Sequence, residues 1–264
     1  MAKQMDERVV WITGGGSGIG RAMAIHYGSR VATVVVSGRR REKLDEVVER
    51  ISEAGGTGSA HPLDVTDEKA VHDVVDAIIA EYGRLDVAVA NAGFGVAGPI
   101  VGLSAADVRR QFDVNVVGLT TTVAAAYPHL RETKGRIVLV ASVMSQLVVP
   151  GSGAYAASKY AVRAIGQTLS MELTGSGVSC TTVHPGFVES EIGQVDNAGR
   201  FDDSRKDPRP EKLMWSAERA AAVIVRAAER RKREYVFTAH GKFGAFIGRH
   251  LPAVNHLLMK GQRR

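Results

Sequence analysis

Residues 9–20, VVWITGGGSGIG, decide the fold, because an apolar and mostly β-branched run leads directly into a glycine-rich turn. The run predicts a buried strand, and the helical periodicity from Ile19 to Arg30 predicts a helix immediately after the glycines. A strand that ends in glycines and continues as a helix is typical of the βαβ units of parallel sheets. Whether the rest of the chain repeats this unit decides between one isolated motif and a complete α/β fold.

The alternation of short strands and longer helices continues almost to the end of the chain. Six more strands are predicted, at VATVVV (31–36), GSAHPL (58–63), LDVAVA (85–90), GRIVLVAS (135–142), VSCTTVH (178–184) and EYVFTA (234–239). Helices are predicted at residues 42–54, 67–82, 105–131, 153–174 and 216–232. This order predicts a single-domain, Rossmann-type α/β fold, a doubly wound parallel seven-stranded sheet with helices on both faces. The carboxyl ends of its strands would form one rim, where ligands bind.

The composition is that of one large domain. The chain has 264 residues, 45% of them hydrophobic and 23% charged, and no linker rich in Pro, Gly or Ser divides it. The net charge is +6, but basic residues are scattered apart from short runs at 39–41 and 230–233, which argues against a nucleic-acid partner. Cys180 is the only cysteine, so an internal disulfide is excluded and a reducing compartment is expected. The apolar run near the N-terminus is too short for a signal peptide or a membrane span, so we expect a cytoplasmic protein.

The glycines after the first strand are placed to receive a phosphate. Gly14, Gly18 and Gly20 allow the backbone to approach a pyrophosphate at the N-terminus of the next helix, where amide groups and the helix dipole favour anions. Glycines also serve plain tight turns, and that alternative stays open for the motif taken alone. The position between a strand and a helix favours dinucleotide binding.

The end of the second predicted strand indicates which dinucleotide is bound. In the usual fingerprint, an acidic residue about twenty positions after the glycines binds the ribose 2′-hydroxyl of NAD. This chain has Gly38, Arg39, Arg40 and Arg41 there. A guanidinium pairs with a 2′-phosphate, so the sequence predicts NADP, with Arg39 as the first choice and NAD as the minority alternative. For Arg40 and Arg41 the alternative is that they only solvate the start of a helix.

Asp64 follows the third predicted strand and has two possible roles. Its carboxylate could accept a hydrogen bond from the adenine amino group, or it could cap the following helix. Thr66 and Asp67 are alternative caps, and either of them would leave Asp64 available.

A second group of polar residues is expected at the same rim. Tyr155 and Lys159, in SGAYAASKYAV, are four residues apart near the start of a helix and therefore share one face. A nearby ammonium stabilises a phenolate, which would let Tyr155 exchange a proton with a substrate oxygen. A half-buried tyrosine beside a solvated lysine is the plainer alternative. Ser142 favours the catalytic interpretation, because it ends an apolar strand at the rim, where a hydroxyl could hold a carbonyl group.

These motifs, in this order and spacing, resemble the classical short-chain dehydrogenase/reductase family over essentially the whole chain. TGGGSGIG at 13–20 is similar to the family's TGxxxGxG, and NAG at 91–93 to the motif that steadies its central sheet. HPGFVES at 184–190 is similar to the family's PG segment, and Asp64 to its adenine-site aspartate.

The resemblance implies a catalytic tetrad and a cofactor site. Tyr155 would be the proton donor in reduction and the base in oxidation, and Lys159 would also bind the nicotinamide ribose. Ser142 would orient the substrate oxygen, and Asn115 would hold a water that links Lys159 to solvent. No metal site is expected. The implied cofactor-binding residues are Gly14, Gly16, Ser17, Gly18, Ile19, Gly20, Arg39, Arg40, Asp64, Val65, Asn91, Ala92, Gly93, Tyr155, Lys159, Pro185, Gly186, Val188 and Ser190.

The function that follows is transfer of a hydride between NADP(H) and a carbonyl compound or secondary alcohol. Three departures from the family pattern stand out: Ala90 replaces the first Asn of the common NNAG, Ser190 stands where Thr is usual, and Ser17 precedes Gly18 where many NADP-preferring members carry a basic residue. A non-catalytic NADP-binding regulator of the same fold is the alternative function. A hydrophobic substrate is predicted from the apolar run after Ser142, which comprises Val143, Met144, Leu147, Val148 and Val149.

The resemblance also divides the chain into regions. Residues 1–100 are expected to hold mainly the cofactor, and residues 101–240 to supply the catalytic and substrate-binding half. The segment Phe187 to Trp215 corresponds to the family's substrate cover, and its polar stretch from Gly193 to Pro210 predicts a mobile loop or lid. The basic, partly amphipathic tail at 241–264 predicts a flap over the substrate mouth or a contact with a neighbouring subunit, in preference to weak contact with a membrane surface. A homodimer or homotetramer, built through the helices at 105–131 and 153–174, is implied as well.

Overall fold

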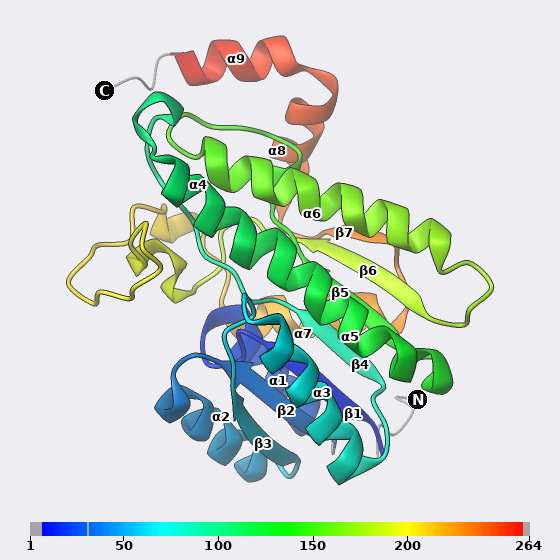
Figure 1. Cartoon of the computed structure of the whole chain (residues 1–264). Helices are drawn as coiled ribbons and strands as arrows, with labels where there is room; N and C mark the ends of the chain where they lie inside the picture. The colour runs from blue at the N-terminus through cyan, green and yellow to red at the C-terminus, as the bar shows by residue number, and fades with distance from the viewer. Residues whose placement is uncertain (1–6, 31, 261–264) are drawn as a thin grey trace.

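Seven parallel strands form one sheet in the order β3-β2-β1-β4-β5-β6-β7 (Figure 1). The computed structural model describes residues 7–30 and 32–260, so Val31 of the predicted second strand and residues 261–264 of the predicted tail lie outside the described residues. The observed arrangement confirms the predicted Rossmann-type sheet. The strands are β1 (Val9–Thr13), β2 (Thr33–Gly38), β3 (Thr57–Pro62), β4 (Val87–Ala90), β5 (Arg136–Val140), β6 (Ser179–His184) and β7 (Glu234–Val236).

Helices cover both faces of the sheet and bury two separate cores (Figure 1). Neighbouring residues of each strand point to opposite faces, so Val10 and Ile12 pack under α1, α2 and α7, whereas Val9 and Trp11 pack under α3, α5 and α6. Burial on both faces explains why the central strands β1 and β4 are almost entirely apolar. The helices are α1 (Gly18–Gly28), α2 (Arg41–Glu53), α3 (Glu68–Tyr82), α4 (Ala105–Phe112), α5 (Gly118–Thr133), α6 (Gly153–Glu172), α7 (Ala217–Glu229), α8 (Ala239–His250) and α9 (Pro252–Lys260).

The strand order reverses between β1 and β4, and this reversal positions the site. The chain runs from β1 outward through β2 to β3, then returns to pair β4 with the other side of β1. At such a switch point the loops that leave the two strands diverge, which opens a crevice at the carboxyl rim. The glycine turn after Thr13 and the NAG motif after Ala90 both lie at this crevice.

The helix predicted at 105–131 is interrupted. A π turn over Asp113–Val117 separates α4 from α5, so the helix holds one extra residue per turn at this point. The side chain of Asn115, in the middle of the turn, is fully buried and bonds to the backbone of Phe94. The segments on both sides of the turn are helical and residues 113–117 contain no proline, which is why the sequence predicted a continuous helix.

The end of the chain also differs from the prediction. The last strand ends at Val236 instead of residue 239, because the Thr238 side chain accepts a hydrogen bond from Gly241 N and starts α8. The tail then folds as two helices, α8 and α9, which break at Pro252. None of the helices in the described part of the chain is long and apolar enough to cross a membrane.

Candidate active site

A cavity of about 530 Å³ opens at the carboxyl rim of the sheet, and most of the predicted site residues line it. Two do not: Gly20 lies behind the glycine turn against the Gly14 carbonyl, and Asn115 lies behind Gly93. No three His, Cys, Asp or Glu side chains of the described residues are grouped to hold a metal ion. The predicted residues in the lining are Gly14, Gly16, Ser17, Gly18, Ile19, Arg39, Arg40, Asp64, Val65, Asn91, Ala92, Gly93, Ser142, Tyr155, Lys159, Pro185, Gly186, Val188 and Ser190.

The glycine turn leaves the N-terminus of α1 open to this cavity. Gly18 has a φ of +49°, and a Cβ there would lie 2.7 Å from Ser190 Cβ, so the turn requires glycine both for its backbone and for the close approach of Ser190. The N-cap residue Ser17 makes no capping hydrogen bond. Amide groups in the first turn of α1 therefore face the cavity without a side-chain partner, an arrangement that fits a pyrophosphate.

The arginines that follow β2 point in different directions. Arg39 lines the cavity, and its Nη2 donates a hydrogen bond of 2.7 Å to the Gly199 carbonyl. Arg41 instead forms an exposed ion pair with Asp45 one turn along α2, at 2.9 Å. This contact agrees with the alternative in which Arg41 only solvates the helix. Lys43, which the sequence analysis did not single out, also lines the cavity beside Gly16.

Asp64 is exposed and lines the cavity at the end of β3. Its Oδ1 accepts hydrogen bonds from the Thr66 backbone at 3.0 Å and the Thr66 hydroxyl at 2.8 Å. The cap of α3 is Asp67, whose carboxylate accepts from Ala70 N at 3.0 Å. Asp64 is therefore not the helix cap, which leaves it facing the cavity.

Asn91 ties the two strands at the switch point together. Its Nδ2 donates to the carbonyls of Thr13 and Gly14, both at 3.0 Å, and its backbone N–H donates to the Thr13 hydroxyl at 3.2 Å. The Thr13 hydroxyl in turn donates to the Val89 carbonyl at 3.3 Å. These bonds fix the glycine turn against the end of β4, where the sequence had predicted a steadying motif.

Tyr155, Lys159 and Ser142 meet at the centre of the cavity. Lys159 is buried, its Nζ donates to the Val140 carbonyl at 2.9 Å, and the same atom lies 5.7 Å from the centroid of the Tyr155 ring. Tyr155 opens to the cavity but is otherwise surrounded by protein, and this burial raises the pKa of its phenol, while a hydrogen bond with Ser142 acts in the opposite direction. Burial lowers the pKa of the Lys159 ammonium to about 8. The three groups can therefore hold and pass a proton at one place.

Asn115 lies one layer behind this group. Its Oδ1 accepts from Phe94 N at 3.1 Å, and its Nδ2 donates to the Phe94 carbonyl at 3.0 Å and the Ser158 hydroxyl at 3.1 Å. A Cβ on Gly93 would lie 3.0 Å from Asn115 Oδ1 and 3.6 Å from Lys159 Nζ. The absence of a side chain at Gly93 therefore brings the amide and the ammonium to opposite sides of one small space.

A buried polar network that the sequence analysis missed supports Ser142. The Ser145 hydroxyl donates to the Ser142 carbonyl at 2.5 Å and lies 2.7 Å from His184 Nδ1. His184 Nε2 lies 3.0 Å from the Glu234 carboxylate, which also accepts from Arg163 at 2.6 Å. The hydrogen bond with His184, helped by Arg163, lowers the pKa of Glu234 to about 2. The network ties the segment after β5 to β7 and α6.

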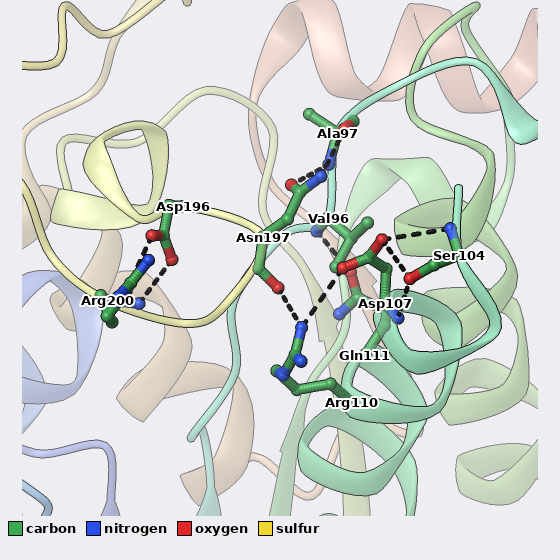
Figure 2. A network of polar contacts seen from close by, with 9 residues as sticks. All are labelled: Val96, Ala97, Ser104, Asp107, Arg110, Gln111, Asp196, Asn197 and Arg200. Carbon is green, nitrogen blue, oxygen red and sulfur yellow. Dashed lines mark hydrogen bonds and ion pairs between the residues drawn. The ribbon is translucent and has the colours of Figure 1, made fainter. Parts of the chain in front are cut away.

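The predicted lid is folded against the body of the protein through Asn197 (Figure 2). The Asn197 side chain makes two hydrogen bonds with the backbone of Ala97, at 2.9 and 3.0 Å. Arg110 of α4 donates to the Asn197 carbonyl at 2.7 Å and also contacts Asp107 at 3.3 Å. Asp107 is itself held in a capping box with Ser104 at the start of α4. One lid residue is thus fastened both to the loop after β4 and to α4.

Arg209 fastens the far end of the lid. Its guanidinium donates to the Val188 carbonyl at 2.8 Å and to the Ser190 carbonyl at 2.7 Å, and it pairs with Asp207 at 2.6 Å. Arg209 lines the cavity beside the residues that pack on the glycine turn. Nothing in the pattern of this polar stretch distinguishes Arg209 from the other arginines of the lid, so the sequence analysis missed it.

The middle of the lid covers the cofactor end of the cavity. Arg40 pairs with Glu191 and stacks on Phe201, with 5.3 Å between its guanidinium carbon and the ring centroid. Phe201 lines the cavity. Trp215 instead packs against the core, 5.6 Å from the ring of Phe237, as expected from the alternative of ordinary core packing.

The apolar wall predicted after Ser142 is absent from the cavity lining within the described residues. Val143 and Leu147 pack against α8, because glycines on that helix let the two segments approach closely. The assignment of Val143, Met144, Leu147, Val148 and Val149 to a substrate wall was therefore wrong. The apolar part of the cavity comes from other elements, with Phe94, Val114, Ile192, Val195 and Phe201 in its lining.

The comparisons with known proteins agree with this geometry. A family model described as short chain dehydrogenase matches residues 8–200. Sulfoacetaldehyde reductase 2 of Chromohalobacter salexigens is 38% identical over 194 residues, which are 72% of this chain and 77% of that protein. The 11-beta-hydroxysteroid dehydrogenase A of Sesamum indicum is 35% identical over 233 residues, which are 86% of this chain and 67% of that protein.

A solved structure extends the likeness to most of the chain. The alcohol dehydrogenase from the archaeon Thermococcus sibiricus, complexed with 5-hydroxy-NADP, superposes with a TM-score of 0.77 at 25% identity. The superposition covers 88% of this chain and 97% of that one. Family match, relatives and fold agree, and the chain belongs to the short-chain dehydrogenase family of oxidoreductases.

Proposed function

We propose that this oxidoreductase uses NADP(H) to interconvert a carbonyl compound and a secondary alcohol, with Tyr155 as the acid and base. The observation that carries the proposal is the meeting of Tyr155, Ser142 and Lys159 in one cavity with an uncapped helix N-terminus. Bound NADPH would supply the hydride in reduction, and bound NADP⁺ would accept it in oxidation. The homo-oligomer and the cytoplasmic location expected from the sequence remain predictions.

The residues around the cavity fit NADP. The glycine turn and the open N-terminus of α1 would hold the pyrophosphate, and Asp64 lies where it would accept from the adenine. One N–H of the Arg39 guanidinium donates to the Gly199 carbonyl, and the other four N–H donors remain for a 2′-phosphate. No acidic residue stands at the end of β2 to repel that phosphate. The alcohol dehydrogenase complexed with 5-hydroxy-NADP gives independent support.

The proton transfer depends on how the protein holds Tyr155. The raised pKa of Tyr155 keeps its phenol protonated near neutrality, as an acid for reduction requires. The Ser142 hydroxyl would orient the substrate oxygen toward that phenol. In oxidation the phenol must lose its proton, and the buried Lys159 ammonium would then stabilise the phenolate.

The substrate we propose is hydrophobic. Aromatic and branched apolar side chains from the loop after β4, the π turn and the segment 187–215 line the cavity, including Phe94, Val114 and Val195. The names of the relatives do not decide this point, since one names a small sulfonated aldehyde and another a steroid. Shape and apolar surface in the cavity therefore carry the substrate proposal.

A direct assay tests these proposals together. NADPH absorbance would be followed with a panel of ketones and aldehydes, in which hydrophobic and small polar members are matched by carbonyl type, and the measurement would be repeated with NADH. We expect turnover with hydrophobic carbonyls and a higher kcat/KM with NADPH. Preference for NADH would contradict the role of Arg39, and preference for small polar carbonyls would contradict the substrate class. Tight NADPH binding without turnover on any member would support the non-catalytic regulator instead.

A further inference from the structure

The last two helices present an apolar surface that the rest of the fold leaves uncovered. α8 carries Phe243 and Phe246, which are 67% and 56% exposed, and α9 carries Leu257 and Leu258, which are 71% and 56% exposed. Figure 1 shows these helices at one end of the molecule, with α9 running across the outside of that end. Large apolar side chains gathered in this way mark a contact site more often than chance exposure does.

The opposite face of α8 explains why the aromatic side chains must point outward. A Cβ on Gly248 would lie 2.0 Å from the Gln146 carbonyl, and a Cβ on Gly244 would lie 2.7 Å from Leu147 Cδ2. Gly241 approaches Val143 in the same way, at 2.8 Å. These three glycines share one face of the helix and bring it against the segment that follows Ser142. The orientation of α8 is therefore fixed by backbone contact.

α9 is fastened to the same segment. Asn255 is the one buried residue among its described positions, and its Nδ2 donates to the Val148 carbonyl at 3.1 Å. The next turn of that segment bonds to the loop after β4 through Gly98 N and the Gly151 carbonyl, at 2.8 Å. That loop carries Val101, which is 98% exposed. Hydrogen bonds thus connect α9, the segment after Ser142 and the loop after β4.

The charges of this surface identify its partner. Residues 239–264 contain five Lys and Arg residues and no Asp or Glu. Lys242, Arg249 and Lys260 are exposed on the same two helices as the apolar residues. A second copy packed symmetrically on this surface would bring cations against cations, which disfavours self-association. An anionic lipid surface offers both an apolar layer and opposite charge.

We propose that the outer faces of α8 and α9 dock on the surface of an anionic lipid bilayer. Phe243, Phe246, Leu257 and Leu258 enter the boundary between headgroups and acyl chains, while Lys242, Arg249 and Lys260 contact the headgroup phosphates. The docked helices lie in the plane of the interface and do not span the bilayer, which agrees with their length and hydropathy. The sequence had favoured a flap or a subunit contact for this tail, whereas the uncovered face and its uniform charge favour the lipid surface. Docking does not depend on the proposed reaction.

The test is cosedimentation of the whole protein with vesicles. One set would be phosphatidylcholine alone and the other an equal mixture of phosphatidylcholine and phosphatidylglycerol. We expect binding to the mixed vesicles that weakens as salt is raised, because headgroup attraction is screened. Absence of binding to the mixed vesicles at low salt would overturn the proposal.

Two combined variants separate the apolar and the charged contributions. The variant Phe243→Ser, Phe246→Ser, Leu257→Ser should bind the mixed vesicles about tenfold more weakly or worse, because three large side chains no longer enter the interface. The variant Lys242→Gln, Arg249→Gln, Lys260→Gln should lose binding by about tenfold and become insensitive to salt. Unchanged binding by the apolar variant would contradict docking through this face.

A matched control removes an equally exposed apolar side chain elsewhere. Met171 of α6 is 68% exposed, and Met171→Ser should bind vesicles as the unaltered protein does. Thermal unfolding and activity without vesicles should be retained in all variants, since none of these residues lines the cavity. Light scattering after gel filtration examines the competing partner. If the apolar variant changes the oligomeric state and the unaltered protein ignores vesicles, the face is a subunit interface and the proposal is wrong.

Discussion

The carboxyl rim of the sheet and the lid, residues 193–210, are held by different kinds of contact. At the rim, Lys159 is fixed by a buried hydrogen bond to the end of β5. Asn91 and Ser142 are fixed by part-buried hydrogen bonds, with the Thr13 carbonyl and Met144 N. In the lid, Asn197 reaches Ala97 across 100 residues of sequence through two exposed hydrogen bonds. The difference teaches that the groups of the proposed reaction are held by the sheet itself, whereas the lid is held at Asn197 by exposed polar contacts.

The largest effect is expected from removing the phenol hydroxyl of Tyr155, which is the proposed proton donor at the rim. Tyr155→Phe should lower kcat by about 10²- to 10⁴-fold, the usual contribution of an acid or base, because it deletes the exchangeable hydrogen and little volume. NADPH binding, followed by fluorescence, should be retained. Tyr160→Phe, on the exposed side of the same helix, is the control and should behave as the unaltered enzyme. Full activity of the Tyr155 variant would mean that the rim does not carry the chemistry.

The next effect tests whether Arg39, which follows β2 at the rim, contacts the 2′-phosphate of the cofactor or only holds the lid through Gly199. Arg39→Ala should lower kcat/KM with NADPH by about 10- to 100-fold and leave the value with NADH nearly unchanged, because a charge-assisted contact with the 2′-phosphate is lost. Arg41→Ala is the matched control, since Arg41 starts α2 two residues later and pairs with Asp45 instead. Equal losses with both cofactors would show that Arg39 acts through Gly199 and the lid, not through the phosphate.

A smaller effect should follow from weakening only the contact between the lid and Ala97. Asn197→Ala removes both bonds to Ala97 and should raise KM for the carbonyl substrate about tenfold, because each bond contributes about 0.5–1.5 kcal/mol to lid closure. The kcat with saturating substrate should change little. Ser204→Ala, which removes a hydrogen bond to Asp202 within the lid only, is the control. A fall in kcat without a change in KM would place Asn197 among the groups that position the reaction.

The smallest effect concerns stability beneath the rim. Glu234→Gln should lower the free energy of unfolding at neutral pH by about 1 kcal/mol, since the partly screened carboxylate loses its contacts with His184 and Arg163. The pKa of Glu234 is depressed in the folded state, so its stabilisation is present above about 4.5 and is lost as the pH falls toward about 2.

Urea unfolding at a series of pH values measures this difference. The gap between the Glu234 variant and the unaltered protein should be widest near neutrality and should close over that acidic range. Asp73→Asn, which breaks an exposed ion pair with Lys69 on α3, should show a much smaller gap at every pH. A gap that does not change with pH would indicate that size or polarity, and not charge, explains the loss.

The contrast between the rim, which is built on the strands, and the lid, which is held by long-range contacts, also explains how far the sequence could predict the structure. Strands, the glycine turn and the positions of Tyr155 and Lys159 follow from local periodicity and spacing, and these were predicted within a few residues. The last strand was predicted too long, because the capping role of Thr238 is not visible in a β-branched run.

The misses are long-range contacts between common residue types. Arg209 is one of several arginines in a polar stretch, and its bonds to Val188 and Ser190 depend on how the lid folds back. His184, Ser145 and Glu234 lie on three separate elements, and no spacing in the sequence joins them. Apolar residues after Ser142 were taken as a wall of the cavity, yet the glycines of α8 draw them to the other side. Pairings of this kind become visible only once the sheet has placed the elements.

Because of the π turn between α4 and α5, the number of residues in this pair of helices determines which neighbours their side chains can contact. Each residue of a regular helix turns the following side chains by about 100°, so deleting one residue from Asp113–Val117 would straighten the helix and keep its packing on one side of the deletion only. Either Asn115 would swing away from Phe94 and Gly93, or Gly118 would leave its close contact with Val65. A regular helix cannot keep the contact of Asn115 with Phe94 and the contact of Gly118 with Val65 at the same time. Single-residue deletions here should therefore be far less tolerated than substitutions at the exposed position Val117.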